Sequence, residues 1–140
     1  MSKLICTLFV LWVGLLLGVS FVATPAKFLA PHLTMSVALE VGKATFHIFN
    51  KVEWVVAIIV AGLTLASNLN IHRWIFIGGL FLLLAVKTFY LLPALDVRAD
   101  IVIAGGTPNP RVLHWLYIIA DLLEIILASI GSWWFMSQNK

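Results

Sequence analysis

The sequence predicts an all-α integral membrane protein that folds as a bundle of four transmembrane helices. Of its 140 residues, 62% are hydrophobic and only 11% are charged. Its mean hydropathy of +1.07 is far above that of soluble domains. The apolar residues fall into four long runs, and the chain has room for about four spans of roughly 20 residues. We therefore expect one membrane domain over residues 1–140, with no soluble catalytic domain and no enzymatic role.

The first apolar run predicts a span over residues 4–23. It resembles a signal peptide, because only Lys3 precedes it as a basic residue. The run is longer than the usual apolar core of a signal peptide and lacks a clear small-x-small exit, so we expect a retained span. Thr24 and Pro25 are expected to end it, because the residue before a proline disfavours helix.

The second segment predicts an unusually long helix. Helical periodicity runs from residue 33 to residue 67, too far for one simple crossing at about 1.5 Å per residue. Its first half carries polar residues, so the membrane span is expected over 46–67. The polar residues 67–73 predict a turn before the next helix.

The third and fourth spans are expected over residues 74–92 and 111–135. Pro93 is expected to close the third span, and a short interfacial helix is expected over 94–104 before the turn GGTPNP. Asn109 and Pro110 are a typical helix start, because Asn caps free amides and Pro tolerates the first turn. The SWWF sequence near the end of the fourth span predicts an aromatic anchor at the membrane interface.

Polar side chains lie along one face of two of the predicted helices. In the fourth span the spacings are three, four and three residues, through His114, Tyr117, Asp121 and Glu124. The second helix repeats these spacings through Glu40, Lys43, His47 and Asn50. Such residues are neighbours on a helix surface. With four crossings, both stripes begin at the same side of the membrane.

Energetics predicts that both stripes face the inside of the bundle. An ionised side chain facing lipid at the membrane centre costs at least about 2.5 to 3.5 kcal/mol. Inside the bundle, Asp121 and Glu124 can pair with Lys43, Lys51 or Lys87 or hold a proton, and we expect at least one of them to be neutral. The predicted polar network between the second, third and fourth helices, which is also a candidate ion path, comprises Glu40, Lys43, His47, Asn50, Lys51, Glu53, Lys87, His114, Tyr117, Asp121 and Glu124.

Three stretches carry a resemblance to a known group of proteins: TPAKF, FNKVEW and KTFYLLPALDVRADIVIAGGTPNPRVLHWLYIIADLLE. They resemble small uncharacterised bacterial four-helix integral membrane proteins, similar to the transmembrane protein 205-like domain group. The resemblance implies the four-helix fold and a bacterial inner membrane, and it implies no particular activity. Members of the group tend to carry an acidic residue and a lysine three apart where this chain has Asp121 and Glu124. The acidic pair therefore needs partners from other helices.

The charge distribution and the single cysteine exclude several kinds of site. Nine basic residues give a net charge of +3 but form no cluster, so no nucleic-acid partner is expected. One cysteine, Cys6, allows neither an internal disulfide nor a thiolate metal cluster. The side that carries the termini has basic residues and no acidic ones, so we expect both termini in the cytoplasm.

Three functional classes fit this sequence. The first is a non-catalytic accessory or assembly subunit of a larger membrane complex, which would pack other subunits or its own copies against glycine and aromatic faces such as Gly14 and Gly18. The second is a small proton, cation or solute transporter that uses the charged residues within the membrane. The third is a haem- or metal-binding protein with His47 and His114 as ligands, although no HxxxH or HxH spacing supports it. We expect no cofactor.

Overall fold

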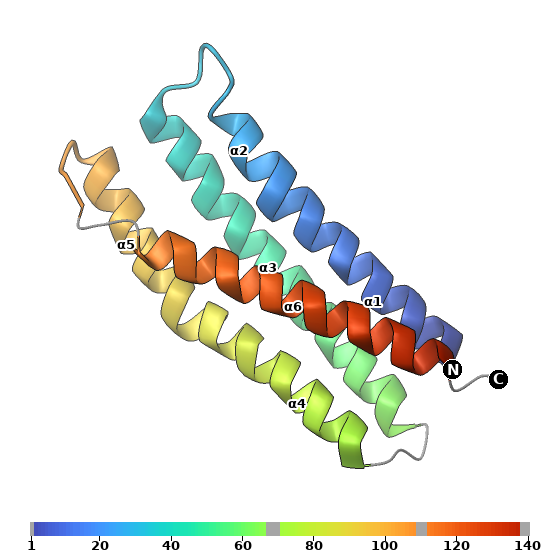
Figure 1. Cartoon of the computed structure of the whole chain (residues 1–140). Helices are drawn as coiled ribbons and strands as arrows, with labels where there is room; N and C mark the ends of the chain where they lie inside the picture. Colours follow the sequence, from blue (N-terminus) through green and yellow to red (C-terminus); the bar gives the residue numbers. More distant parts are fainter. Residues whose placement is uncertain (1, 67–70, 109–111, 138–140) are drawn as a thin grey trace.

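The computed structural model describes residues 2–66, 71–108 and 112–137, and these residues form a bundle of four long helices (Figure 1). Four helices are long and apolar enough to cross a membrane: Ser2–Lys27, Met35–Leu65, Trp74–Ile103 and Val112–Ser137. The described part of the chain contains no strand. The predicted all-α bundle of four transmembrane helices is therefore confirmed. Both ends of the chain lie at one end of the bundle, here called the terminal end (Figure 1).

The first crossing consists of α1 (Ser2–Leu16), the π-helical segment η1 (Leu17–Ala23) and α2 (Thr24–Lys27). The expected stop at Pro25 is wrong, because the helix continues to Lys27. The backbone N–H of Thr24 donates to the carbonyl of Val19, five residues back, and the Thr24 hydroxyl donates to the same oxygen at 2.9 Å. This wider turn relieves the clash that a proline ring makes with the preceding turn of a regular α-helix.

The second crossing is the single helix α3 (Met35–Leu65) of 31 residues. Thr34 caps it, because its side-chain oxygen accepts a hydrogen bond from the N–H of Val37 at 3.4 Å. At about 1.5 Å per residue the helix is roughly 46 Å long, against roughly 30 Å for the hydrocarbon core of a bilayer. The helix that was predicted to be long is thus continuous from Met35 and covers the expected span 46–67 as far as Leu65.

The third crossing joins α4 (Ile71–Val86), the π-helical segment η2 (Lys87–Leu91) and α5 (Leu92–Ile103) without a break. The helix predicted over 94–104 is present as α5, but Pro93 does not separate it from the third span. The reason is the same as in the first crossing: the N–H of Leu92 donates to the carbonyl of Lys87, five residues back. Gly105, with φ of 83°, follows this helix in a left-handed conformation.

The fourth crossing is α6 (Val112–Ser137), close to its predicted bounds of 111–135. It packs along α1 near the terminal end (Figure 1). The turn predicted over 67–73 is wrong in its last three residues, because α4 begins at Ile71. Residues 67–70 of that turn, the cap at Asn109 and Pro110, the start at Arg111 and the terminal residue Lys140 lie outside the described residues. The opposite end of the bundle, which carries residues 28–34 and 104–108, is here called the cavity end.

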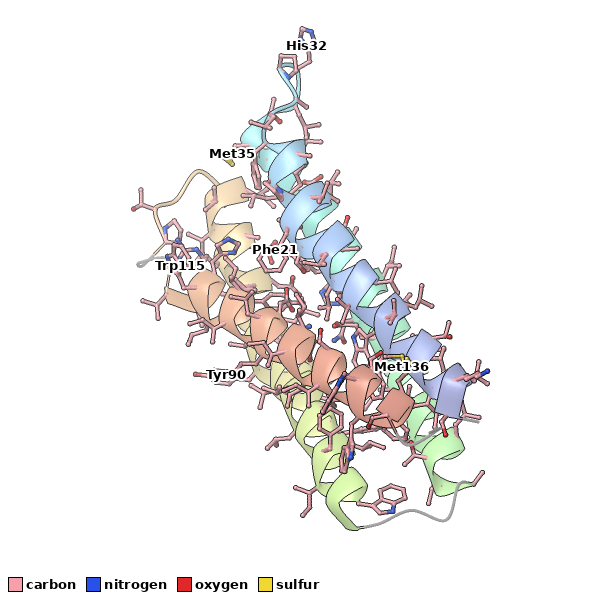
Figure 2. The ribbon with its side chains drawn as sticks, turned by 45° about the vertical axis from the view of Figure 1, so that its right-hand side comes forward. Phe21, His32, Met35, Tyr90, Trp115 and Met136 are labelled. Carbon is pink, nitrogen blue, oxygen red and sulfur yellow. The ribbon has the colours of Figure 1, made fainter. Side chains whose placement is uncertain are left out.

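The apolar core has two unequal parts. The larger part fills the terminal half of the bundle and includes Phe9, Trp12, Leu80 and Phe135. The smaller part lies toward the cavity end and consists of the buried residues Leu91, Leu92, Tyr117 and Ala120. Figure 2 shows large side chains such as Tyr90 pointing away from the bundle, as expected of a helix that faces lipid.

Candidate functional site

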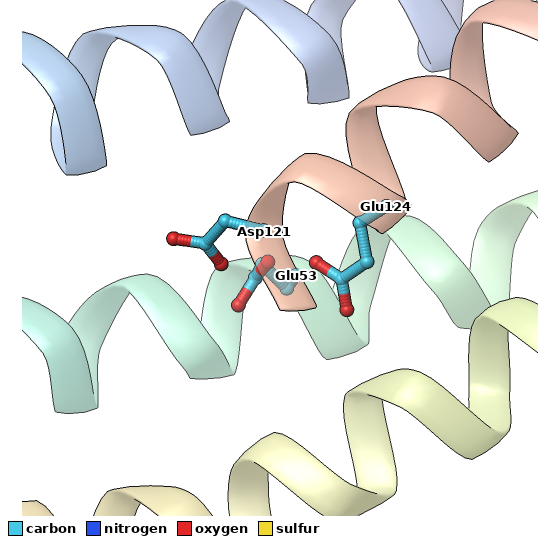
Figure 3. Close-up of side chains that lie close together, drawn as sticks. All are labelled: Glu53, Asp121 and Glu124. Carbon is cyan, nitrogen blue, oxygen red and sulfur yellow. The ribbon is translucent and has the colours of Figure 1, made fainter. Parts of the chain in front are cut away.

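Four charged side chains meet inside the bundle, between the two parts of the apolar core. The ammonium of Lys87, on η2, lies 2.7 Å from Oε1 of Glu53 on α3. It lies 2.7 Å from Oδ1 of Asp121 and 2.8 Å from Oε2 of Glu124, both on α6. Figure 3 shows the three carboxylates turned toward one another from these two helices. All four residues are at most 1% exposed, and we call them the buried acidic cluster.

The buried acidic cluster has more acceptor atoms than donors. Lys87 donates hydrogen bonds to Glu53 and Glu124, whereas its contact with Asp121 lies outside hydrogen-bond geometry. The second oxygens of Glu53 and Glu124, and both oxygens of Asp121, are buried without a hydrogen-bond partner in the described structure. Buried polar groups are normally hydrogen-bonded, so these oxygens call for protons, water or a cation.

Aromatic rings and a neutral polar layer surround the cluster. The Lys87 ammonium lies 5.2 Å from the ring centre of Tyr117 and 5.9 Å from that of Phe49. One turn away on α3, the Asn50 amide and the Trp54 indole N–H both donate to the hydroxyl of Thr88, at 3.0 and 2.9 Å. These neutral contacts tie η2 to α3 beside the charged cluster.

Two further pairs join α3 to α5 nearer the cavity end. The ammonium of Lys43 donates to Asp100 at 2.5 Å, and Nε2 of His47 lies 2.6 Å from a carboxylate oxygen of Asp96. Sequence reasoning named Lys43 and His47 but missed both acidic partners, because it placed residues 94–104 in a separate interfacial helix. The shared spacing of four residues in the two pairs was the available signal.

The structure does not bring all the predicted network residues together. Glu40, Lys51 and His114 are exposed, whereas Glu53 and Glu124 are fully buried. Ten residues turn an α-helix through about 1000°, which is about 80° short of three turns. The stripe of α3 therefore drifts around its helix, and Glu40 at its outer end leaves the inner face. His114, although exposed, still lies in the wall of both hollows at the cavity end. Lys51 lies two residues, or about 200°, from Glu53 and points away from it.

A cavity leads from the cavity end toward the buried acidic cluster. The larger hollow, of about 530 Å³, lies among α2, α3, α5 and α6, and Tyr117 lies in its wall. A second hollow of about 300 Å³ shares Phe28, Phe46 and Tyr117 with the first and has Asp121 in its wall. Figure 2 shows Phe21, another residue of this wall, on the side of its helix that faces α5 and α6. Toward the terminal end the cluster meets the larger apolar core.

The three carboxylates are spaced like the ligands of a metal ion. One oxygen from each of Glu53, Asp121 and Glu124 can be chosen so that all three lie within 4.8 Å of one another. Oxygen ligands suit hard cations, but the Lys87 ammonium already lies among these oxygens. A bound metal would have to displace it. The haem or metal site at His47 and His114 stays a prediction, and Nε2 of His47 is engaged by Asp96.

Comparison with known proteins identifies the family of this chain. The family described as Domain of unknown function (DUF4149) matches residues 7–97, which is more than half of the chain. The chain belongs to the DUF4149 family. The matched region contains Glu53 and Lys87 but ends before the two acidic residues of α6. No curated protein and no solved structure matches the chain.

Proposed function

We propose that this DUF4149 protein is a non-catalytic membrane protein that takes up protons or a small cation from one side of the membrane into the buried acidic cluster. One observation carries the proposal: three carboxylates face a single ammonium, and all four groups are buried. With every group ionised the cluster would carry two excess negative charges. Uncompensated charge within a membrane is costly, so up to two further positive charges belong there.

The position of Asp121 supports uptake from the cavity end. Its carboxylate lies 2.7 Å from the Lys87 ammonium but accepts no hydrogen bond from the described residues, and Asp121 forms part of the wall of the smaller cavity. Glu53 and Glu124 are held directly by the Lys87 ammonium. In the proposed cycle, Asp121 receives the incoming proton or cation, and Lys87 redistributes its hydrogen bonds among the three carboxylates.

The test is ion uptake by liposomes that contain the purified full-length protein. A dye inside the liposomes reports proton entry under an imposed potential, and parallel runs contain sodium or potassium. Uptake above that of protein-free liposomes should fall to background in Asp121→Asn, with the variant inserted normally. The matched control is Asp100→Asn, which neutralises an exposed carboxylate of α5. Equal uptake by wild type and Asp121→Asn, or no uptake above background by wild type, would reject the proposal.

A second candidate function is that of an accessory or assembly subunit of a larger membrane complex. Gly14 and Gly18, four residues apart on the first crossing, are exposed, and a Cβ atom at either would meet nothing within 4 Å. Small residues at this spacing allow close approach of a neighbouring helix, and no helix of the described chain takes that place. Gentle detergent extraction and native electrophoresis should show comigration with other chains, or with copies of this one, that Gly14→Leu weakens. A clean monomer in wild type would count against this role.

We also infer the narrower group to which the protein belongs, its membrane and its orientation in that membrane. The stretches TPAKF and FNKVEW support membership of the transmembrane protein 205-like group, and with it a bacterial inner membrane. The basic residues without acids at the terminal end support cytoplasmic termini. Topology reporters fused at Thr107 and at Lys140 should report opposite sides, with the Lys140 fusion in the cytoplasm.

A further inference from the structure

Lys27, at the end of α2, has an unusual environment for a lysine. It is only partly exposed, and its ammonium lies 5.1 Å from the ring centre of Phe28 and 5.7 Å from that of Phe46. Among the described residues, which include all six acidic residues of the chain, no carboxylate forms an ion pair with it. The cation is thus held by aromatic faces alone.

The amine of Lys27 points into the bundle. A Cβ atom built on Gly42 of α3 would overlap the Lys27 ammonium, so the side chain reaches across to the opposite helix. A lysine at the end of a membrane helix usually extends its charge outward, to water and lipid head groups. Here the charge lies in the wall of the larger cavity instead.

The larger cavity has the size and the chemistry of a ligand site. Its volume of about 530 Å³ is within the usual range for small-molecule pockets of roughly 300–1,000 Å³. Most of its other wall residues are apolar, including Met35, Leu39, Leu95 and Val102. The other lysine of this wall, Lys43, is already paired with Asp100. The wall also contains Asp96, which is paired with His47, together with Arg98 and His114. A mainly apolar chamber with a lysine that has no carboxylate partner is complementary to a molecule that has an anionic head and an alkyl chain.

We propose that the larger cavity binds an amphipathic organic anion, with its carboxylate or phosphate head on Lys27 and its alkyl chain among the apolar side chains of α3 and α5. A small hydrophilic anion would leave the apolar walls unfilled, and a neutral lipid would leave the ammonium unpaired. The alkyl chain would extend toward Phe46 and Tyr117, which also belong to the wall of the smaller cavity. A bound ligand would therefore narrow the passage from the cavity end to Asp121.

The test is photo-crosslinking of the full-length protein in phosphatidylcholine nanodiscs with a diazirine analogue of oleate. Mass spectrometry should map labelled peptides to the cavity walls of α3 and α5. Unlabelled oleate or phosphatidylglycerol should compete, and the stronger competitor distinguishes a free fatty acid from a lipid head group. Oleyl alcohol, which has the chain without the charge, and acetate, which has the charge without the chain, should compete at least about tenfold more weakly.

Variants distinguish a bound anion from general partition into lipid. Lys27→Gln should lower cavity labelling by about tenfold or more, and Lys27→Arg should restore it. Lys51→Gln, the same change at an exposed lysine of α3, should leave labelling unchanged. Unchanged labelling in Lys27→Gln, equal competition by oleyl alcohol, or labels confined to lipid-facing residues such as Tyr90 would overturn the proposal. Labelling is measured without ion flux, so failure here and failure of ion uptake are separate outcomes.

Discussion

The two halves of the bundle are built on different principles. In the terminal half, α1 packs along α6, and the ring centre of Phe9 lies 6.0 Å from that of Phe76 and 5.9 Å from that of Phe135. In the cavity half, the helices diverge around two hollows and are joined by ion pairs. The buried acidic cluster lies at the boundary.

This difference indicates one-sided access to the charged groups. Lipid tails are as apolar as leucine, so tight packing, rather than exclusion from water, joins helices in the terminal half. Among the described residues, such packing closes the polar route beyond the cluster in this conformation, so transfer of an ion across the membrane requires helices of the terminal half to separate. The two hollows of the cavity half leave a route from one surface to Asp121.

The largest loss of stability is expected from Lys87→Met, at the boundary between the two halves. The substitution keeps an unbranched side chain but leaves three buried carboxylates without a cation. Loss of one partner from a buried ion pair typically costs about 3–5 kcal/mol. Unfolding of the reconstituted protein by a denaturing detergent, followed by tryptophan fluorescence, measures the change. Lys51→Met is the control, and equal stability of the two variants would mean that Lys87 does not hold the cluster together.

A smaller loss of stability is expected from Gly131→Ala in the terminal half. The new Cβ would lie 2.7 Å from one ring atom of Phe76 and 3.2 Å from one of Phe9, so both rings must move. Overpacking of this kind costs roughly 1–3 kcal/mol. The same unfolding assay should show the loss, whereas ion uptake by protein that remains folded should match wild type. Gly62→Ala is the control, because its Cβ would meet nothing within 4 Å. Loss of uptake in folded Gly131→Ala would contradict the division between the halves.

The smallest change in stability is expected from Asp100→Asn in the cavity half. The Asp100 side chain is 61% exposed, and exposed ion pairs contribute little to stability. The unfolding free energy should stay close to the wild-type value at all salt concentrations. A large loss of stability would mean that the pairs between α3 and α5 hold the cavity half together.

The sequence predicts the four crossings and the inward direction of Lys87, Asp121 and Glu124, because both follow from the cost of exposing polar groups to lipid. It does not predict the continuity of helices through Pro25 and Pro93, because a π-helical turn has no signature in a hydropathy pattern. It does not find Lys27, which reads as an ordinary basic residue after a span until α3 is placed beside it. Nor do the spacings of three and four residues indicate that Glu40 leaves the inner face, because the drift reaches about 80° only after three turns.

The π-helical segment η2 changes the azimuth of every side chain that follows it. In an uninterrupted α-helix, the nine residues from Lys87 to Asp96 would put these two on opposite faces, about 180° apart. A π turn holds one extra residue, which removes about 100° and brings Asp96 to within about 80° of Lys87. One helix can thereby present a cation to the acids of α6 and α3, and then acids to the basic residues of α3. Deletion of one residue between positions 88 and 91 would convert the segment to regular α-helix and keep Asp96 about 80° from Lys87, because eight residues turn the helix through about 800°. Forcing the segment into α-helix at its present length would instead turn Asp96 to the opposite face.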